Sequence, residues 1–295
     1  MRRTSLLPLL FATVVLFGCR QETTADNDQR ETTLVTDGMG RELELEVPAH
    51  RVLALAPNLT EIIYAIGAGD RLVAVSQADN FPQEVDDLPR FSSFPLNHEQ
   101  VVGFQPDLLL ATEGVNSPTD AEALAEVNVP TYFLSFERIS DIPEAMRGIG
   151  DLLGVDGAAV AAAFDAEVDS LRKRTADLTR PTVLLLIDDV GLYAFGRDSY
   201  ASEAIRLAGA ENLTDEFDGQ AAVPSAEFVL DRAPDFIVLL SGDDDYSAAD
   251  LLAKQPAWEA IPAIRNDQVF SVHPDLLARP GPRLLDGIQH VIRHI

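Results

Sequence analysis

The sequence contains almost no cysteine and very little lysine. Cys19 is the only cysteine, so no disulfide can form within one chain, and Lys173 and Lys254 are the only lysines. The 295 residues carry a formal net charge of -26 at pH 7, and no contiguous basic segment is present that could bind a phosphate backbone. We therefore expect no nucleic-acid partner. The acidic surface is compatible both with adaptation to salt and with ordinary solubility.

The motifs of common enzymes are also missing. The chain has no Walker phosphate loop, no complete dinucleotide fingerprint and no G-x-S-x-G nucleophile elbow. Ser170 and Lys173 match the spacing of the first motif of penicillin-binding enzymes, but no Ser-Asp-Asn or Lys-Thr-Gly accompanies them. We therefore predict no catalytic residue, and an exported enzyme that uses Ser170 and Lys173 stays open as an alternative.

Two groups of residues could attract a metal ion. His290 and His294 are four residues apart on a predicted helix, but no cysteine or glutamate partner accompanies them at zinc-site spacing. The three aspartates at 243–245 lack the alternation and the glycine of a calcium-binding EF-hand loop. Both groups indicate a solvated surface, and we predict no bound metal and no intrinsic cofactor.

The N-terminus carries an export signal. Arg2 and Arg3 precede an apolar stretch over residues 5–17, which is too short for a permanent membrane span and ends in Leu-Phe-Gly-Cys. This arrangement is similar to a bacterial lipoprotein signal, so we predict a signal peptide over residues 1–18 and lipidation of Cys19. An ordinary signal peptide with an incidental cysteine is the alternative. Residues 19–33 are polar and aperiodic, which predicts a flexible tether.

Two copies of one pattern divide the rest of the chain. "EQVVGFQPDLLLA" begins at Glu99 and "EFVLDRAPDFIVL" begins at Glu227, and in each a Pro-Asp pair separates a short helix from a buried parallel strand. Upstream of each copy, Thr60 and Ser202 are predicted helix N-caps, each followed by a glutamate in the first turn and later by a closing Gly-Ala pair. The repeat predicts two homologous lobes.

Strand and helix signals alternate through both copies. Predicted strands cover residues 52–56, 72–76, 108–111 and 131–134 in the first copy and 183–187, 236–240 and 269–272 in the second. Between the copies, apolar residues at helical spacing predict a helix over residues 157–178, about 33 Å long. The prediction is an α/β fold of two Rossmann-like lobes joined by a single long interdomain helix. A helix packed flat on one lobe is the alternative.

These elements place the domain boundaries. We predict an N-terminal lobe over residues 34–140, a linking helix region over 141–180 and a C-terminal lobe over 181–295. The segment 77–97 is rich in proline, asparagine and serine, and we expect a long functional loop there without helix or strand. An amphipathic helix is expected after Pro282.

The sequence resembles a known family over residues 50–294. "RVLALAPNLTEIIYAIGAGDRLVAV", "AGAENL" and "RPGPRLLDGI" are similar to the substrate-binding proteins of vitamin B12 and ferric-siderophore ABC importers, above all the cobalamin-binding members. The resemblance implies two lobes of the helical-backbone metal receptor type, a ligand in the cleft between them and no catalysis. It implies cobalamin or a related corrinoid as the transported ligand, with a ferric siderophore or haem as the alternative.

The resemblance also implies a docking role for the repeated glutamates. Members of the family dock on a homodimeric permease, which works with ATPase subunits, through one acidic residue at the tip of each lobe. By position these residues are Glu99 and Glu227, so an internal repeat would present the same charge twice to a symmetric partner. The alternative is that both only complement a helix dipole beside a cap.

Ligand contacts follow from the same resemblance. The implied residues are aromatics on two loops and two polar side chains near the C-terminus, namely Phe81, Phe94, Tyr193, Phe195, Tyr200, Asp275 and Arg279. Aromatic faces with a few polar groups suit a flat macrocycle. Thr112 and Ala221 depart from the pattern, because similar cobalamin binders carry tryptophan there. Each aromatic could instead belong to the core.

The sequence therefore predicts an exported, lipid-anchored receptor on the periplasmic or cell-surface side of a bacterial membrane. It would bind a small molecule in the cleft, a permease at the lobe tips and the lipid bilayer through its N-terminal anchor. A surface scaffold that binds no small molecule is a further alternative.

Overall fold

The computed structural model describes residues 30–295, of which residues 31–295 form one compact unit. The predicted signal peptide, Cys19 and most of the predicted tether lie outside the described residues. The tether prediction was wrong for residues 31–33, because β1 (Glu31–Thr36) pairs antiparallel with β2 (Glu42–Val47), starting from Glu31 opposite Val47. This strand is mostly exposed and is held by backbone hydrogen bonds to β2. Because it buries few side chains, its sequence lacks the apolar alternation from which a strand is predicted.

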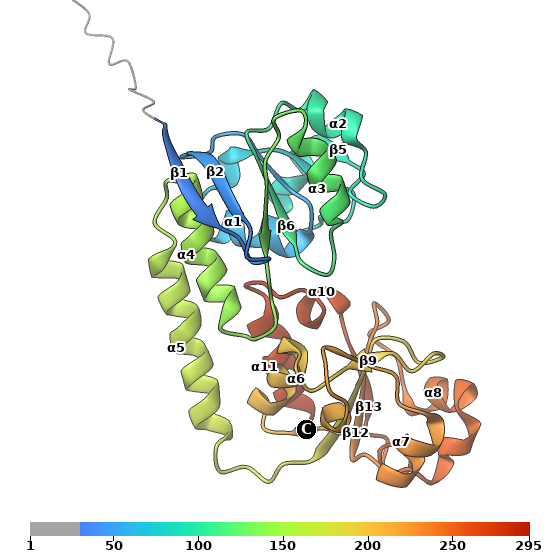
Figure 1. The fold of residues 1–295 in the computed structure, drawn as a ribbon. Helices are drawn as coiled ribbons and strands as arrows, with labels where there is room; N and C mark the ends of the chain where they lie inside the picture. The colour runs from blue at the N-terminus through green and yellow to red at the C-terminus, as the bar shows by residue number, and fades with distance from the viewer. Residues whose placement is uncertain (1–29) are drawn as a thin grey trace, which may run out of the picture. The chain divides into compact units, whose positions relative to one another are not determined.

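The first lobe is built on a parallel sheet with strand order β5-β4-β3-β6-β7 (Figure 1). Its strands are β3 (Val52–Ala54), β4 (Leu72–Ser76), β5 (Arg90–Phe91), β6 (Leu108–Thr112) and β7 (Thr131–Leu134). Its helices are α1 (Pro57–Ala65), α2 (His98–Gly103) and α3 (Pro118–Ala125), with 3-10 turns η1 (Gly69–Arg71) and η2 (Gln83–Asp87). β5 and η2 lie inside the predicted structureless loop, which corrects that prediction. Both are too short to produce a periodic sequence signal.

The second lobe repeats this sheet and extends it. Four strands are parallel, namely β8 (Thr182–Leu186), β10 (Glu211–Asn212), β12 (Phe236–Leu240) and β13 (Val269–Val272). β9 (Ala194–Phe195) and β11 (Ala221–Ala222) add an antiparallel edge next to β8. The helices are α6 (Tyr200–Leu207), α7 (Ala226–Arg232), α8 (Ala248–Lys254), α9 (Pro262–Arg265), α10 (Pro274–Leu277) and α11 (Leu284–His294), with η3 (Leu213–Glu216) and η4 (Pro256–Ala260). The strands predicted over 236–240 and 269–272 are confirmed.

One long helix, α5 (Ala158–Thr175), joins the lobes, and α4 (Asp141–Leu153) lies beside it. α4 ends at Gly154, which adopts a left-handed conformation (φ +69°), and α5 follows. Figure 1 shows α4 and α5 side by side, with α5 running from the first lobe to the second. α5 has 18 residues, so it spans about 27 Å and is shorter than the predicted helix over 157–178. It contacts both α4 and α6, which confirms the interdomain helix and excludes packing on one lobe alone.

The core has a shared part and two separate parts. Alternate residues of each central strand face opposite ways, so Val52 and Val183 enter one cluster that includes α1, α4, α5, α6 and α11. Leu53 faces an outer cluster in the first lobe, whereas Leu184 faces an outer cluster in the second. The lobes are thus packed on one continuous apolar core, which positions the cleft between them.

The predicted N-caps of the two repeated helices were wrong. α1 begins at Pro57 after Ala56, and α6 is capped by Ser199, whose Oγ accepts a hydrogen bond from the amide of Ser202 (3.1 Å). Pro57 suits the first helical position because its φ angle is already close to helical and it has no amide to satisfy. Thr60 and Ser202 are both buried inside their helices. The Thr-Glu and Ser-Glu pairs therefore identify the internal repeat, but they lie within the helices and do not indicate where the helices begin.

Candidate ligand-binding cleft

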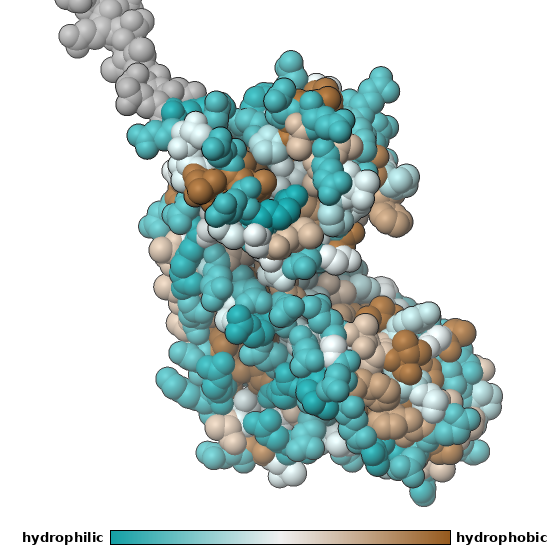
Figure 2. Space-filling view, viewed as in Figure 1, coloured by the Kyte–Doolittle hydropathy of each residue, from teal (hydrophilic) through white to brown (hydrophobic). Residues whose placement is uncertain are grey.

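A cavity of about 550 Å³ lies between the lobes, and Figure 2 shows the visible surface hollowed there. Its first-lobe wall follows the carboxyl ends of the parallel strands, with Asn58 at the start of α1, Thr112 at the end of β6 and Ser135 after β7. Its second-lobe wall includes Phe195, at the end of β9, and the segment that follows α10. Ligands of α/β sheets characteristically bind outside the carboxyl ends of the strands. The cavity is therefore the candidate ligand site.

Two aromatic rings of the second lobe line this cavity. The centroids of Phe195 and Tyr200 are 6.0 Å apart in a tilted arrangement. Burial raises the pKa of the Tyr200 hydroxyl well above its ordinary value, so the ring stays neutral. Phe195 is positioned by the antiparallel β9–β11 edge, which has no counterpart in the first lobe. The pair supplies apolar faces to a ligand.

A buried polar cluster joins the lobes at the edge of the cavity. Glu61 of α1 accepts hydrogen bonds from Nε of Arg283 at Oε2 (2.9 Å) and from Nη2 of Arg283 at Oε1 (2.5 Å). The same Oε1 accepts a hydrogen bond from Nη1 of Arg279 (3.3 Å). The side chain of Glu61 is 2% exposed. The hydrogen bonds between Arg283 and Glu61, together with the nearby carboxylates, raise the pKa of the Arg283 guanidinium, which therefore stays charged.

Asp275 and Asn80 complete this cluster. Asp275 lies 2.8 Å from Nη2 of Arg279 and accepts a hydrogen bond from Nδ2 of Asn80 (2.7 Å). Nη1 of Arg279 donates to Oδ1 of Asn80 (2.8 Å), and its Nη2 donates to the carbonyl of Ala78 (3.2 Å). We call Glu61, Asn80, Asp275, Arg279 and Arg283 the interlobe cluster, because the first two belong to the first lobe and the last three to the second.

The predicted ligand residues occupy three different settings. Phe195, Tyr200 and Arg279 line the cavity. Asp275 is buried and belongs to the interlobe cluster. Phe81 adjoins the cluster, because the guanidinium of Arg283 lies 4.3 Å from the centroid of its ring. Phe94 (91% exposed) and Tyr193 (57% exposed) extend into solvent outside the cavity lining.

The sequence reasoning missed Asn58, Glu61 and Arg283. Glu61 and Arg283 stood inside the quoted segments, but Glu61 was interpreted only as a first-turn acid. Thr112, which departs from the tryptophan of similar proteins, lies in the cavity wall, and its hydroxyl donates a hydrogen bond to Oδ1 of Asn58 (3.3 Å). Ala221, the other departure, is exposed on β11. A threonine in this wall leaves open space that a tryptophan would fill.

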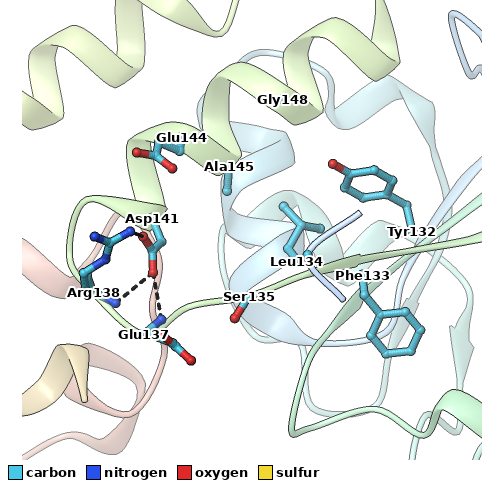
Figure 3. A pocket seen from close by; sticks show the side chains of 11 residues that line it. Tyr132, Phe133, Leu134, Ser135, Glu137, Arg138, Asp141, Glu144, Ala145 and Gly148 are labelled. Atoms are coloured by element: carbon cyan, nitrogen blue, oxygen red, sulfur yellow. Dashed lines mark hydrogen bonds and ion pairs between the residues drawn. The ribbon is translucent and has the colours of Figure 1, made fainter. Parts of the chain in front are cut away.

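A second cavity of about 350 Å³ adjoins the first, and Ser135 and Glu137 line both. Figure 3 shows it between β7 and the first turns of α4. Asp141 accepts hydrogen bonds from the amides of Glu137 and Arg138, both at 2.8 Å. These bonds hold the segment that leaves the first lobe, so the second cavity is a side groove of the first.

The two repeated docking candidates have matching local geometry. Glu99 and Glu227 are each the second residue of a short helix, and the N-cap side chains, Asn97 and Ser225, each accept an amide hydrogen bond of 3.1 Å. Both glutamates are exposed. Figure 1 shows α2 in the first lobe and α7 in the second, each far from the interlobe boundary at α10. The repeat therefore presents one acidic side chain on each lobe in the same local setting.

Another buried carboxylate lies in the second lobe outside the cavity lining. Asp189, which is 5% exposed, accepts hydrogen bonds from the Tyr246 hydroxyl and the Lys254 ammonium, both at 2.6 Å. Burial alone would raise the pKa of Asp189, but these hydrogen bonds and the Lys254 charge lower it below its ordinary value of 3.8. The cluster ties the segment after β8 to α8.

Other candidate sites show no functional geometry. Ser170 and Lys173 lie on α5 outside the cavity lining, and no hydrogen bond joins their side chains. The rings of His290 and His294 stack at 4.5 Å, and burial lowers the pKa of His290. Within residues 30–295, no group of three His, Cys, Asp or Glu side chains could hold a metal ion. None of the helices in the described part of the chain has the length and apolar character needed to span a bilayer.

Comparison with known proteins identifies the family. A family model described as periplasmic binding protein matches residues 52–276. The chain belongs to the periplasmic binding protein family. An uncharacterized ABC transporter substrate-binding lipoprotein of Bacillus subtilis, YvrC, is 26% identical over 302 aligned residues, which cover 97% of this chain and 95% of the relative.

Solved structures of this family have the same fold. The periplasmic vitamin B12-binding protein BtuF of Vibrio cholerae aligns with a TM-score of 0.70 and 27% identity, over 84% of this chain and 96% of that protein. A periplasmic haem-binding protein of Pseudomonas aeruginosa aligns with a TM-score of 0.71 and 27% identity, over 83% and 91%. These findings confirm the predicted family and fold. The family consists of binding proteins.

Proposed function

We propose that this protein is a lipid-anchored receptor that captures cobalamin or a related corrinoid in the interlobe cleft and delivers it to an ABC importer. The observation that carries the proposal is the cavity between the lobes, where Phe195, Tyr200 and Arg279 face the carboxyl ends of the first-lobe strands. Its volume of about 550 Å³ lies within the range of small-molecule pockets. The similarity to a vitamin B12-binding protein supports the ligand class.

Aromatic faces and amide-bonding groups suit a corrinoid. Phe195 and Tyr200 offer apolar contact to a flat ring, while Asn58 and Gln220 also line the cavity and can bond amides. We place the exposed aromatics Phe81, Phe94 and Tyr193 around the ligand at the mouth of the cleft. Thr112 leaves space in the cavity wall for ligand atoms.

A ferric siderophore or haem is the second candidate, favoured by the similarity to a haem-binding protein. Haem and the ferric complexes of catecholates or citrate are anionic, so they call for basic side chains in the cleft. Arg279 is the one cation among the described residues that line the cavity, and it is already paired with Glu61 and Asp275. Glu113 and Glu137 add negative charge to the wall. This electrostatic setting favours an uncharged ligand.

Delivery would use the two lobe tips. Glu99 and Glu227 would bind basic residues of a homodimeric permease that works with ATPase subunits. Val102 (42% exposed) and Leu230 (40% exposed) lie three residues further along the same helices and share their faces with the glutamates. An exposed ion pair contributes only about 0.2 to 1 kcal/mol, so the glutamates would set orientation more than affinity.

The anchor would be a lipid on Cys19, after removal of residues 1–18. Support comes from the sequence pattern and from the relative that is named a lipoprotein. Radiolabelled palmitate in producing cells would be incorporated into the protein and would be lost from a Cys19→Ser variant. Incorporation into the variant would overturn the anchor.

Calorimetric titration of residues 20–295 with cyanocobalamin tests the ligand. We expect one-to-one binding with micromolar or tighter affinity and a matching rise in melting temperature. Hemin and a ferric siderophore are titrated in parallel. If hemin or the ferric siderophore binds and cyanocobalamin does not, the second candidate replaces the proposed ligand. If none of the three ligands binds, the result favours a scaffold that binds no small molecule.

A further inference from the structure

The interlobe cluster controls how Arg279 can meet a ligand. A guanidinium has five N–H donors and no acceptor. Four donors of Arg279 face acceptors of the protein: its Nη1 lies 3.3 Å from Glu61 and 2.8 Å from Asn80, and its Nη2 lies 2.8 Å from Asp275 and 3.2 Å from the Ala78 carbonyl. Nε–H is the one donor of Arg279 with no hydrogen-bond partner among the described residues. Arg279 therefore cannot offer the two-pronged fork with which arginine binds carboxylates.

The charges of the cluster also cancel. Glu61 and Asp275 are two carboxylates, and Arg279 and Arg283 are two guanidiniums, all with side chains at most 18% exposed. An anion that entered the cavity would meet a neutralised arginine and the wall residues Glu113 and Glu137. Glu113 and Glu137 are exposed, so water screens them in part, but their charge still opposes the entry of an anion.

Arg283 shows how such a paired guanidinium can bind a ring. Its N–H groups bond both oxygens of Glu61, while its carbon lies 4.3 Å from the centroid of the Phe81 ring. Stacking of a guanidinium on a conjugated ring needs the face and not the edge. Arg279 lines the cavity and has its edge occupied in the same way, so stacking through its face is the contact left for a ligand.

We propose that Glu61 and Asp275 act as positioning residues that set the charge selectivity of the cleft, so that Arg279 accepts an uncharged conjugated ring and rejects an anionic chelate. Rejection by unfavourable pairing is a general route to specificity. The inference rests on the proposed function, because it takes the interlobe cavity as the ligand site.

The internal repeat provides a matched control. Glu203 of α6 is the counterpart of Glu61 in the second lobe, but its carboxylate accepts a hydrogen bond from the amide of Ile139 (2.8 Å). Glu203 does not line the cleft cavity. A Glu203→Gln variant thus removes one charge from an equivalent helix position without freeing Arg279.

The test compares dissociation constants for hemin and cyanocobalamin in residues 20–295. For Glu61→Gln and, separately, Asp275→Asn, we expect hemin affinity to rise about 10- to 100-fold, the range of a hydrogen bond to a charged group. The gain should shrink at high salt. Glu203→Gln should leave the hemin affinity unchanged.

If Glu61 and Asp275 had only a structural role, their substitution would weaken the binding of hemin and of cyanocobalamin together. The ratio of the two affinities is therefore the decisive measurement. Melting temperatures show whether each variant is folded, and the inference can be tested with Asp275→Asn alone if Glu61→Gln does not fold. Folded variants that bind hemin no better than wild type would overturn the inference. Wild-type protein that does not bind cyanocobalamin would instead overturn the proposed function, while the hemin comparison between variants would still decide the role of the cluster.

Discussion

The two lobes share a sheet and differ at its edge. β3, β6 and β7 of the first lobe correspond to β8, β12 and β13 of the second, with the same parallel pairing. Only the second lobe adds the antiparallel strands β9 and β11, and β9 carries Phe195 into the cavity. The repeated part therefore builds the scaffold, and the unrepeated edge adds an aromatic ring to the ligand site.

A second contrast separates Glu61 from Glu203. These residues occupy the same place in the repeat, yet Glu61 binds two arginines of the other lobe and Glu203 binds one backbone amide. The difference arises because Glu203 faces the backbone of the segment between β7 and α4, whereas Glu61 faces charged side chains of the segment after α10. The same local sequence thus serves two tertiary settings.

Reversal of both docking glutamates should have the largest effect. We expect Glu99→Arg with Glu227→Arg to abolish uptake of the ligand in cells, and each single change to leave partial uptake, because one lobe could still dock. Ligand affinity of the purified protein should not change. Uptake of labelled cyanocobalamin measures the first effect and calorimetry the second.

Glu122→Arg is the matched control, because Glu122 is an exposed acid on α3 of the first lobe. If this variant lost uptake as well, general surface charge and not the repeated tips would explain docking. A large loss of ligand affinity in the double variant would place the glutamates in the cleft.

The outer clusters allow a matched test of stability. Leu53 and Leu184 occupy equivalent positions on β3 and β8, and both are fully buried. Either change to alanine should lower the free energy of unfolding by about 2 to 5 kcal/mol, because each leaves a cavity in an outer cluster. Urea unfolding measures this, with Leu34→Ala (63% exposed in the wild type) as the control that should change little. A loss confined to one lobe would contradict the equivalence.

The aromatic residues of the two lobes should differ in their effect on binding. Phe195→Ala should weaken cyanocobalamin binding about tenfold, because this ring lines the cavity. Phe94→Ala should have a smaller effect, because the ring is 91% exposed. Calorimetric titration of both variants measures the difference. A larger loss for Phe94→Ala would mean that the ligand rests mainly on the first lobe.

The smallest effect concerns pH and the second lobe alone. Because the folded-state pKa of Asp189 lies below its ordinary value of 3.8, its ionised form stabilises the fold. This contribution is complete above pH 3.8 and is lost as pH falls through the folded-state pKa. Asp189→Asn should therefore be less stable than wild type at pH 7, and the gap should narrow below about pH 4. Urea midpoints across this range measure it, and a gap that does not change with pH would contradict the pairing with Lys254.

Several features were predictable because their signal is local. The strands Phe236–Leu240 and Val269–Val272 are apolar runs bounded by breakers, and the interdomain helix is an apolar stripe at helical spacing. The helix starts were less predictable. A proline at Pro57 and a serine at Ser199 precede the Thr-Glu and Ser-Glu pairs, and both signals were available in the sequence.

The site depended on contacts that no local pattern contains. Glu61 and Arg279 are 218 residues apart in sequence. Each fits an explanation of its own, Glu61 as an acid in the first turn of a helix and Arg279 as a ligand contact. Only their meeting across the lobes shows that the arginine is already neutralised.

By itself, the sequence determined the two-lobe α/β architecture, the linking helix and the duplicated acidic tips, because periodicity and repetition are properties of neighbouring residues. Tertiary structure alone decided which residues face the cleft and which charges cancel there. Burial and ion pairing depend on distances between chain segments, and those distances exist only once both lobes have packed on their shared core.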